Sequence, residues 1–128
     1  MEIGLGYYEY PFASGLVMGG YSGRNGNSTG THDPICARAV LWRDTSNSIL
    51  LIEADFIGLN KERVQNLKTK LNQKYKIPLE NILIAIIHTH SAPLNIELFT
   101  QPSQNVVNLF EQGLLTAADQ AFTSIFPA

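Results

Sequence analysis

The first clear pattern in the chain is a pair of apolar segments separated by a short polar turn. Residues 35–42 and 48–56 are both mainly apolar, as expected of strands, and Arg38 is the one charged residue in the first segment. The residues between them, 44–47, read Asp-Thr-Ser-Asn, a cluster that favours turns. A link this short joins neighbouring antiparallel strands. Residues 35–56 are therefore predicted to form a β-hairpin.

A helix and a third strand are predicted after the hairpin. Asn60 is a good helix N-cap, and apolar residues recur at helical spacing from Val64 to Tyr75, ahead of Pro78. Residues 82–87 then read Ile-Leu-Ile-Ala-Ile-Ile, apolar on both faces, which is typical of a buried parallel strand. A strand, a helix and a strand in this order favour a right-handed crossover between parallel strands.

A second amphipathic helix is predicted near the end of the chain, with Ser103 at its N-cap. The apolar positions on one side of this helix are Val107, Phe110, Leu114, Ala117, Ala121 and Ile125. The predicted fold class is therefore α/β: a mixed sheet with an N-terminal hairpin, a right-handed parallel crossover and two packed helices.

The composition indicates a single globular domain over residues 1–128. Hydrophobic residues make up 45% of the chain and charged residues 16%, which is too apolar for a disordered chain. Residues 19–34 are rich in Gly, Asn and Ser and are predicted to form a loop. Loops of this length are often functional, and a floppy surface loop is the alternative interpretation.

Charge and cysteine content exclude several classes of function. The net charge of −2 argues against a general nucleic-acid binder, which would be basic. Cys36 is the only cysteine, so an intrachain disulfide and a cysteine-based metal cluster are excluded. No secretory signal and no transmembrane segment is expected, and the compartment stays open. Six of the nine basic residues fall between Lys61 and Lys76, which we interpret as a solvated helix face.

The first candidate functional residues follow the most buried predicted strand, where residues 88–93 read His-Thr-His-Ser-Ala-Pro. Side chains two residues apart in a strand point the same way, so both His88 and His90 are expected to face one site. Ligands of open α/β sheets bind at the carboxyl ends of strands, and neutral imidazole is the commonest metal ligand. Two histidines hydrogen-bonded to backbone in a strand-end loop are the alternative interpretation.

Three further residues are candidates for the same site. Asp55 ends the neighbouring strand, where its carboxylate can bind a cation, orient an imidazole or cap the next turn. Arg38 can pair with Asp55 or Glu53, or face solvent at a sheet edge. His32 lies just before the hairpin in Gly-Thr-His-Asp-Pro and either joins the site or belongs to a turn.

Taken in order, these pieces resemble the N-terminal domain of the neutral/alkaline, non-lysosomal ceramidase family, over nearly the whole chain. The matching segments are residues 18–21 (Met-Gly-Gly-Tyr), 30–34 (Gly-Thr-His-Asp-Pro), 37–39 (Ala-Arg-Ala), the strand ending in Asp55, 81–84 (Asn-Ile-Leu-Ile), 88–93 and 121–128. The family pattern around the histidines is usually Thr-His-Thr-His-Ser-Gly-Pro. This chain departs from it with Ile87 in place of the first threonine and Ala92 in place of the glycine.

The resemblance implies a zinc-dependent amidase that splits N-acylsphingosine, a ceramide-like N-acyl lipid, into fatty acid and sphingosine. It implies that His88 is a zinc ligand and that His90 is a catalytic neighbour that hydrogen-bonds near the reacting group. It also implies that Asp55 belongs to a second divalent cation site, for calcium or magnesium. His32 matches a histidine of the family pattern to which no role is assigned.

The resemblance further implies that the chain is the N-terminal portion of a longer enzyme. The other zinc ligands of the family, a second His, a Glu and a Tyr, come from downstream, so this chain supplies one ligand of four. The isolated chain is therefore expected to be inactive and to bind zinc weakly. An uncovered sheet edge or apolar face is expected to favour self-association.

Two other functions fit the same residues. One is a non-catalytic α/β interaction module that retains the fold but not the complete metal site. The other is a different His-x-His metallohydrolase, which fits least well because at least two strands precede the motif and an Asp-His continuation is missing. A further His and a Glu–Tyr pair encoded beyond Ala128 would favour the ceramidase-like enzyme over the interaction module.

Overall fold

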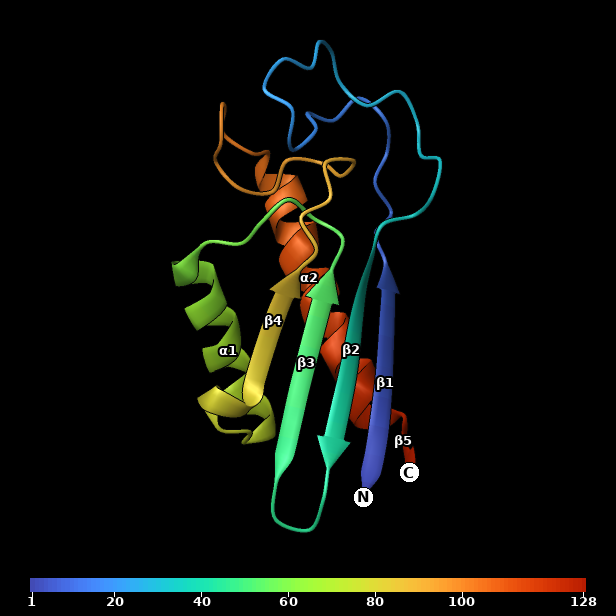
Figure 1. Cartoon of the computed structure of the whole chain (residues 1–128), viewed down its shortest axis with the longest axis vertical. Helices are drawn as coiled ribbons and strands as arrows, with labels where there is room; N and C mark the ends of the chain where they lie inside the picture. The colour runs from blue at the N-terminus through green and yellow to red at the C-terminus, as the bar shows by residue number, and fades with distance from the viewer.

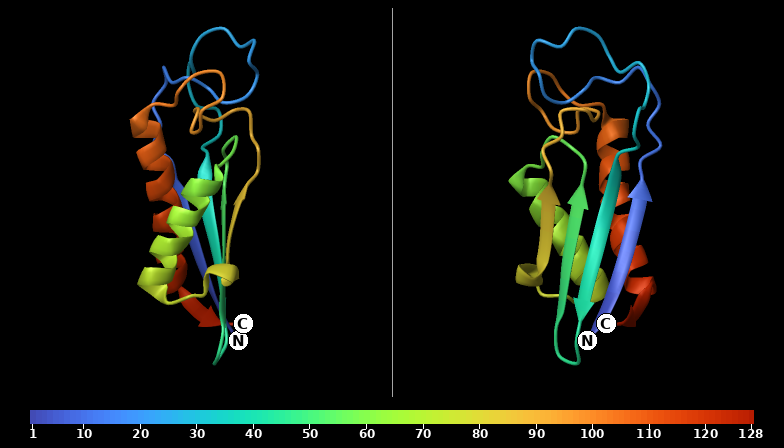
Figure 2. Two further views of the ribbon diagram at one scale, coloured as in Figure 1. Left: turned by 90° about the vertical axis from the view of Figure 1, so that its left-hand side faces the viewer. Right: turned by 45° about the vertical axis from the view of Figure 1, so that its right-hand side comes forward.

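The chain folds into one five-stranded sheet with two long helices on one of its faces (Figure 1; Figure 2, left). This computed structural model describes residues 1–128. The strands lie in the order β4-β3-β2-β1-β5. The elements are β1 (Glu2–Glu9), β2 (Cys36–Arg43), β3 (Ser48–Ala54), α1 (Lys61–Tyr75), the short 3-10 helix η1 (Leu79–Asn81), β4 (Ile82–Ile86), α2 (Gln104–Thr123) and β5 (Ile125–Pro127).

The hairpin and the parallel crossover are both present, so the predicted fold class is confirmed. Strands β2 and β3 pair antiparallel across the turn at residues 44–47. Strand β4 pairs parallel with β3, with Leu50 opposite Ile82 and Ala54 opposite Ile86. Helix α1 makes the connection between them, and residues 19–34 contain no helix or strand.

Local capping explains where α1 begins and ends. The Asn60 side chain accepts a hydrogen bond of 2.9 Å from the Arg63 backbone N–H, as an N-cap should. At the other end Lys76 adopts a left-handed conformation with φ of 58°, and its N–H donates to the Asn72 carbonyl. Both ends of α1 therefore follow from side chains and backbone geometry within a few residues.

Helix α2 differs from its prediction at both ends. Ser103 occupies the N-cap position, but its side chain makes no capping hydrogen bond. Ile125, predicted on the apolar side of the helix, instead begins strand β5, because α2 ends at Thr123. The Ser124 hydroxyl bonds to both the N–H and the carbonyl of Leu5, which fixes the start of β5 beside β1.

Strand β1, like β5, was not predicted by the apolar pattern. The glycines of β1 explain why the strand was not predicted, and they also allow α2 to pack against it. A Cβ placed on Gly4 or Gly6 would lie 1.8 Å from the carbonyl oxygen of Ala121 or Ala117, respectively. Glycine weakens a strand by itself, but here it lets α2 lie directly on the backbone of β1.

The inner face of the sheet and the two helices enclose one hydrophobic core. Leu41, Leu50 and Ile52 of the sheet are fully buried. Phe56, just beyond β3, packs edge-on against Phe110 of α2 with ring centroids 4.6 Å apart. Burying side chains of this size contributes about 1.5–3 kcal/mol each, so this layer supplies much of the stability of the fold.

The outer face of the sheet is covered by neither helix (Figure 2, left). Two rows of register partners cross it, and both are wholly apolar. The first row is Leu5, Val40, Leu51 and Leu83, and the second is Phe126, Ile3, Trp42 and Ile49. The next row towards the carboxyl end carries Tyr7, Arg38, Glu53 and Ala85. We call the first two rows the outer apolar face.

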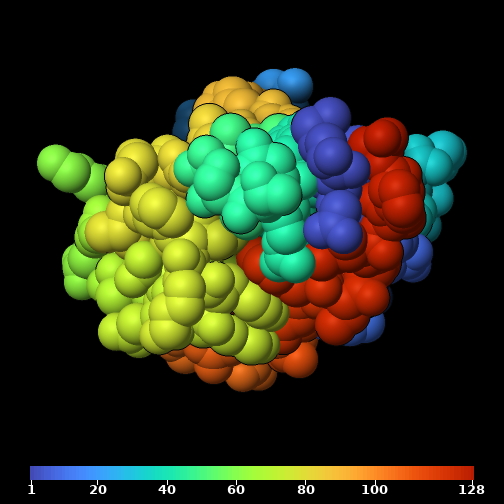
Figure 3. Space-filling model, turned by 90° about the horizontal axis from the view of Figure 1, so that it is seen from below, coloured from blue at the N-terminus to red at the C-terminus, as the bar shows by residue number.

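The chain termini meet at the end of the sheet where the β2–β3 turn lies. Figure 3 shows the first and last residues side by side on that end of the molecule. The Ala128 N–H donates to the Met1 carbonyl at 3.1 Å, which continues the pairing of β1 with β5. The long loops gather at the opposite end, beyond the carboxyl ends of β3 and β4 (Figure 1). Neither helix has the length and hydropathy needed to cross a bilayer.

Candidate functional site

The residues that follow β3 and β4 lie at the same edge of the sheet. Asp55 and Ile87 directly follow the paired residues Ala54 and Ile86. The pairing continues past the strands, because the Ile87 N–H donates to the Ala54 carbonyl at 3.3 Å and the Thr89 N–H to the Phe56 carbonyl at 3.1 Å. The segment that carries the histidines is thus held on the end of β3.

His88 has a backbone conformation that is unusual for its residue type. Its φ of 64° lies in the left-handed region, which costs a non-glycine residue about 1–2 kcal/mol. Strain of this kind persists where the surrounding structure holds it, and such residues cluster at functional sites. His88 Nδ1 lies 2.7 Å from the Ile57 carbonyl oxygen. A carbonyl only accepts, so Nδ1 carries the proton and Nε2 keeps a free lone pair.

The free nitrogen of His88 faces the second histidine. His88 Nε2 and His90 Nε2 are 3.4 Å apart. Two nitrogens at about 2.0–2.1 Å from a tetrahedral zinc ion are separated by about 3.3–3.4 Å, so the pair fits two corners of such a site. The same spacing also fits a long N–H···N hydrogen bond in the absence of metal. The sequence prediction that both imidazoles face one site agrees with this geometry.

The two histidines have no third potential metal ligand beside them in this chain. No group of three or more His, Cys, Asp or Glu side chains lies close enough to hold an ion. A catalytic zinc site uses three protein ligands and one open position. The residues present therefore fit part of a zinc site, and a third ligand from within residues 1–128 is not in place.

Asp55 lies at the predicted edge, but its carboxylate is already engaged. Its Oδ1 and Oδ2 accept hydrogen bonds from the Arg38 guanidinium at 2.9 and 3.2 Å, and Oδ2 also accepts from the Cys36 backbone N–H at 2.8 Å. Arg38 donates as well to Glu53 at 2.9 Å. The hydrogen bond to Asp55 raises the pKa of Arg38 above its ordinary value. A cation at Asp55 would have to displace this guanidinium.

Cys36 is buried behind the same row of side chains. Its thiol lies 2.9 Å from the Tyr7 hydroxyl and 3.7 Å from the Pro34 carbonyl. The hydrogen bond with Cys36, together with burial, raises the pKa of Tyr7 to about 12.

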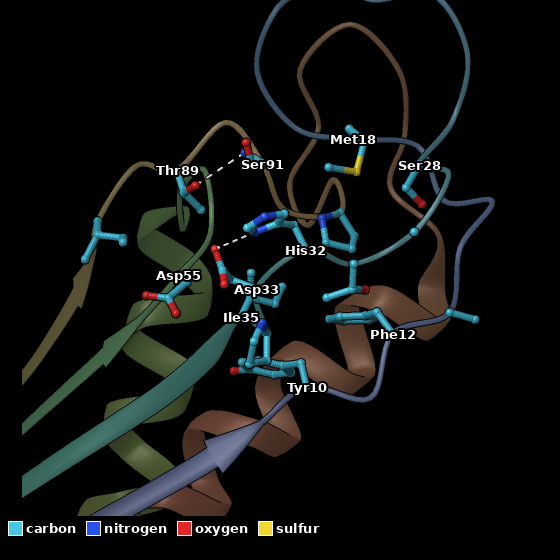
Figure 4. A pocket seen from close by; sticks show the side chains of 16 residues that line it. Tyr10, Phe12, Met18, Ser28, His32, Asp33, Ile35, Asp55, Thr89 and Ser91 are labelled. Atoms are coloured by element: carbon cyan, nitrogen blue, oxygen red, sulfur yellow. Dashed lines mark hydrogen bonds and ion pairs between the residues drawn. The ribbon is translucent and has the colours of Figure 1, made fainter.

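A cavity of about 570 Å³ opens on the other side of the histidine segment (Figure 4). Its wall includes Ile87, Thr89 and Ser91, which alternate with His88 and His90 along the chain. The apolar residues of the wall are Tyr10, Phe12, Ala13, Met18, Ile35 and Ile87. The histidine pair and the cavity therefore lie on opposite sides of one short segment.

His32 belongs to the cavity and not to the histidine pair. Its Nδ1 lies 2.9 Å from Asp33 Oδ2, and both side chains are almost fully exposed. Figure 4 shows His32 among the cavity residues, with Asp55 and Thr89 on the neighbouring wall. Of the five candidates, the structure thus pairs His88 with His90, pairs Arg38 with Asp55, and leaves His32 at the cavity.

Other contacts at this end involve residues that sequence reasoning did not assign. Tyr21 and Arg24, from the glycine-rich loop, contact His90. Asn95 is fully buried and donates from Nδ2 to the Gly58 carbonyl at 2.8 Å, next to the carbonyl that His88 holds. A long-range side-chain contact leaves no periodic pattern in the sequence, so these contacts could not be predicted. The Gly-Gly-Tyr motif at residues 19–21 was the one feature that drew attention to this loop.

No protein-family profile matches the chain, and no curated protein sequence matches it. Solved structures do match. The neutral ceramidase of Pseudomonas aeruginosa superimposes with a TM-score of 0.83 and 21% identity over 98% of this chain. A ceramidase complexed with C2 gives the same values. The chain spans 22% of the length of these structures.

The fold class is thus a mixed α/β sheet with its helices on one face, shared over almost the whole chain with much longer proteins. More narrowly, it is a neutral ceramidase-like fold.

Proposed function

We propose that the chain is the part of a zinc-dependent amidohydrolase, related to neutral ceramidase, that carries the first zinc ligand. The observation that carries this proposal is the histidine pair: His88 Nε2 and His90 Nε2 face each other at 3.4 Å, with His88 Nδ1 held by the Ile57 carbonyl. The ceramidase-like fold supports it. The substrate is an N-acyl lipid of the ceramide class, cleaved to fatty acid and sphingosine.

Each candidate residue has a role in this proposal. His88 Nε2 is the zinc ligand, and the Ile57 carbonyl orients its ring and fixes the tautomer. His90 hydrogen-bonds near the reacting amide or acts as a substitute ligand. A zinc ion held here would supply Lewis acidity, polarising an amide carbonyl and lowering the pKa of a bound water. Asp55 is the candidate for calcium or magnesium if Arg38 moves away, and His32 lines the adjoining cavity without an assigned step.

The isolated chain is proposed to be inactive. Two imidazoles without a third ligand hold zinc poorly, since a catalytic site needs three protein ligands. A substrate would also lack most of its pocket, so remote binding energy could not position the amide. Completion of the site by a further polypeptide segment is part of the proposal.

The three histidines of the chain provide a direct test, because each has its own imidazole resonances. Zinc is titrated into the 15N-labelled chain, and the ring signals are followed by NMR. We expect His88 and His90 to shift together at high zinc concentration while His32 shifts less. A titration in which the pair is unaffected, or in which His32 responds first, contradicts the metal assignment.

Amide hydrolysis is tested on the same material. A fluorescent N-acylsphingosine is incubated with the purified chain and zinc, and we expect no release of fatty acid. Turnover that disappears in His88→Ala would contradict the proposed inactivity, and would mean that the chain builds a complete site alone or by assembling copies.

The outer apolar face favours a second candidate function, an interaction module, and we propose that its occupant is a second copy of this chain. Leu5 and Leu83 are each about half exposed in a row that contains no polar residue. On one face of a sheet each residue covers about 4.8 Å across the strands and about 6.6 Å along them, so the eight residues of the outer apolar face cover roughly 250 Å². Two copies packed face to face would bury about 500 Å² of apolar surface, less than the about 1,000 Å² of a stable specific interface, so the proposed dimer is weak and transient.

Analytical ultracentrifugation at rising concentration tests the self-association. We expect a reversible dimer in the wild type that weakens at least tenfold in Leu51→Lys, because a lysine in the middle of the face is buried without a partner in the dimer. Thr45→Lys, in the exposed β2–β3 turn, is the matched control and should leave the dimer intact. A wild-type chain that stays monomeric at every concentration overturns the proposal.

A further inference from the structure

We infer that the glycine-rich loop is a clamp that positions His90, with Arg24 as its principal positioning residue; this inference deepens the proposed function and rests on it. The clamp consists of Gly20, Tyr21 and Arg24. All three contact His90 from a segment that is about 70 residues away in sequence. Nothing in the hairpin or in the crossover requires these contacts.

Gly20 forms the part of the clamp that lies on the imidazole. It adopts a φ of 71°, and a Cβ added to it would lie 2.4 Å from His90 Cγ and 2.6 Å from His90 Nδ1. Real Cβ atoms do not approach a ring so closely, so the backbone can lie against His90 only with glycine at this position. The close contact restricts how far the ring can rotate towards the loop.

Tyr21 closes a second side of the ring. Its aromatic ring meets the His90 imidazole edge-on, with centroids 4.7 Å apart and planes at 76°. Such edge-to-face pairs are favourable beyond the burial of the two rings. Tyr21 itself has a φ of 36°, a left-handed conformation that is strained for any residue other than glycine. The loop is therefore held in a strained conformation that places this ring against His90.

Arg24 links the glycine-rich loop to His90 and to the Tyr21 ring. Its Nη2 donates to the His90 carbonyl oxygen at 2.9 Å, and its guanidinium carbon lies 5.4 Å from the centre of the Tyr21 ring. A hydrogen bond from a charged donor is stronger than one between neutral groups, so this contact helps to hold the strained loop in place. One side chain thus fixes both the His90 backbone and the aromatic ring that packs on its imidazole.

The base of the loop is anchored without Arg24. The Gly19 N–H donates to the Ala92 carbonyl at 2.8 Å, and the Leu94 N–H donates to the Val17 carbonyl at 2.8 Å. Met18 and Pro93 form an antiparallel bridge between these bonds. Removal of the Arg24 side chain should therefore release the tip of the loop while the rest of the chain stays folded.

The consequence concerns the distance between the two histidines. Besides the contacts with Tyr21 and Gly20, the His90 ring lies edge-on to the His88 ring, at 5.0 Å between centroids. His88 is fixed by its own hydrogen bond to Ile57, so the 3.4 Å separation of the Nε2 atoms depends on how well the clamp holds His90. The clamp preorganises the pair in the way that outer-shell residues orient metal ligands.

The test compares Arg24→Ala with Arg24→Lys and with a matched control, Asn27→Ala. Asn27 lies in the same loop and donates to the Gly15 carbonyl at 2.9 Å, away from His90. The first measurement is the set of NOE contacts between the Tyr21 and His90 rings. We expect Arg24→Ala to lose them, Arg24→Lys to keep part of them, and Asn27→Ala to keep them all.

The second measurement is the zinc concentration at which the His88 and His90 signals shift. Changes in outer-shell residues typically cost 10–100-fold in metal affinity, so we expect a loss of roughly tenfold in Arg24→Ala and a smaller loss in Arg24→Lys. If the wild-type pair does not bind zinc at all, the metal assignment fails, and the NOE contacts alone decide the clamp. Tyr21–His90 contacts that are unchanged in Arg24→Ala overturn the inference.

Discussion

His88 and His90 present their Nε2 atoms to each other at 3.4 Å, although both belong to an irregular segment beyond the end of β4. The positive φ of His88 turns its ring onto the Ile57 carbonyl, and the loop at residues 19–24 holds His90 from the other side. Two imidazoles at this separation fit two corners of a tetrahedral zinc site, as the proposed function requires. This relationship leads to the first prediction.

Removing either histidine of the pair should abolish the response of the other to zinc. In His88→Ala the His90 resonances should no longer shift at the zinc concentrations that affect the wild type, because one imidazole alone binds zinc far more weakly than two. His32→Ala is the control and should behave as the wild type. Persistence of the His90 shift in His88→Ala would show that His90 binds zinc through other groups.

The contact between β1 and α2 should tolerate no side chain at Gly6. In Gly6→Ala the new Cβ would overlap the Ala117 carbonyl, so strand and helix must move apart. We expect a loss of about 2–4 kcal/mol in the free energy of unfolding, measured by urea denaturation, as for an overpacked core site with backbone displacement. In Gly23→Ala, where the added atom meets open space, the change should stay within about 0.5 kcal/mol.

The two carboxylates that share Arg38 should differ in their contribution to stability. Asp55 has a nearly buried side chain and also accepts from the Cys36 N–H, so Asp55→Asn should cost about 1–3 kcal/mol. Glu53 is about one-third exposed and bonds only to Arg38, so Glu53→Gln should cost less than about 1 kcal/mol. Thermal or urea unfolding of the two variants measures the difference, and equal losses would contradict the assignment.

Acid should weaken the β2–β3 turn through Asp44. Its Oδ1 accepts from the backbone N–H groups of Ser46 and Asn47 at 2.8 and 2.7 Å, and these bonds lower the pKa of Asp44. A carboxyl whose pKa is lowered by folding contributes stability above its unfolded pKa of about 3.9 and loses it as the pH falls through the folded value.

The Asp44→Asn variant isolates that contribution. We expect the wild type to lose more stability than Asp44→Asn between pH 5 and pH 2, because the amide does not titrate. Urea denaturation at a series of pH values measures the difference. If the free energy of unfolding falls equally in the two proteins between pH 5 and pH 2, the Asp44 carboxylate does not contribute to the loss of stability in acid.

Much of the fold could be predicted from local pattern. The apolar runs that became β3 and β4 are separated by one amphipathic helix, and Asn60 marks the start of that helix. These features act within a few residues, so sequence alone is enough to place them. The histidine motif could also be placed at the carboxyl end of a strand, since that position depends only on where β4 ends.

Strand β1 could not be predicted in the same way, because its glycines are unfavourable in an isolated strand. Gly4 and Gly6 become favourable only when α2, more than 100 residues later in the chain, lies on them. Strand β5 depends in turn on β1, since Ile125 pairs with Gly4. The two strands therefore exist through contacts that no short window of sequence contains.

The candidate site divides in the same manner. The sequence by itself determined that His88, His90 and Asp55 would emerge at one edge of the sheet, because strand direction and strand ends are encoded locally. Only the tertiary structure decided that Asp55 pairs with Arg38, that His32 lines a separate cavity, and that Arg24 holds His90. Each of these contacts joins side chains from segments that are distant in sequence. They form only when the whole chain has packed, because packing determines which of several possible partners lies within reach.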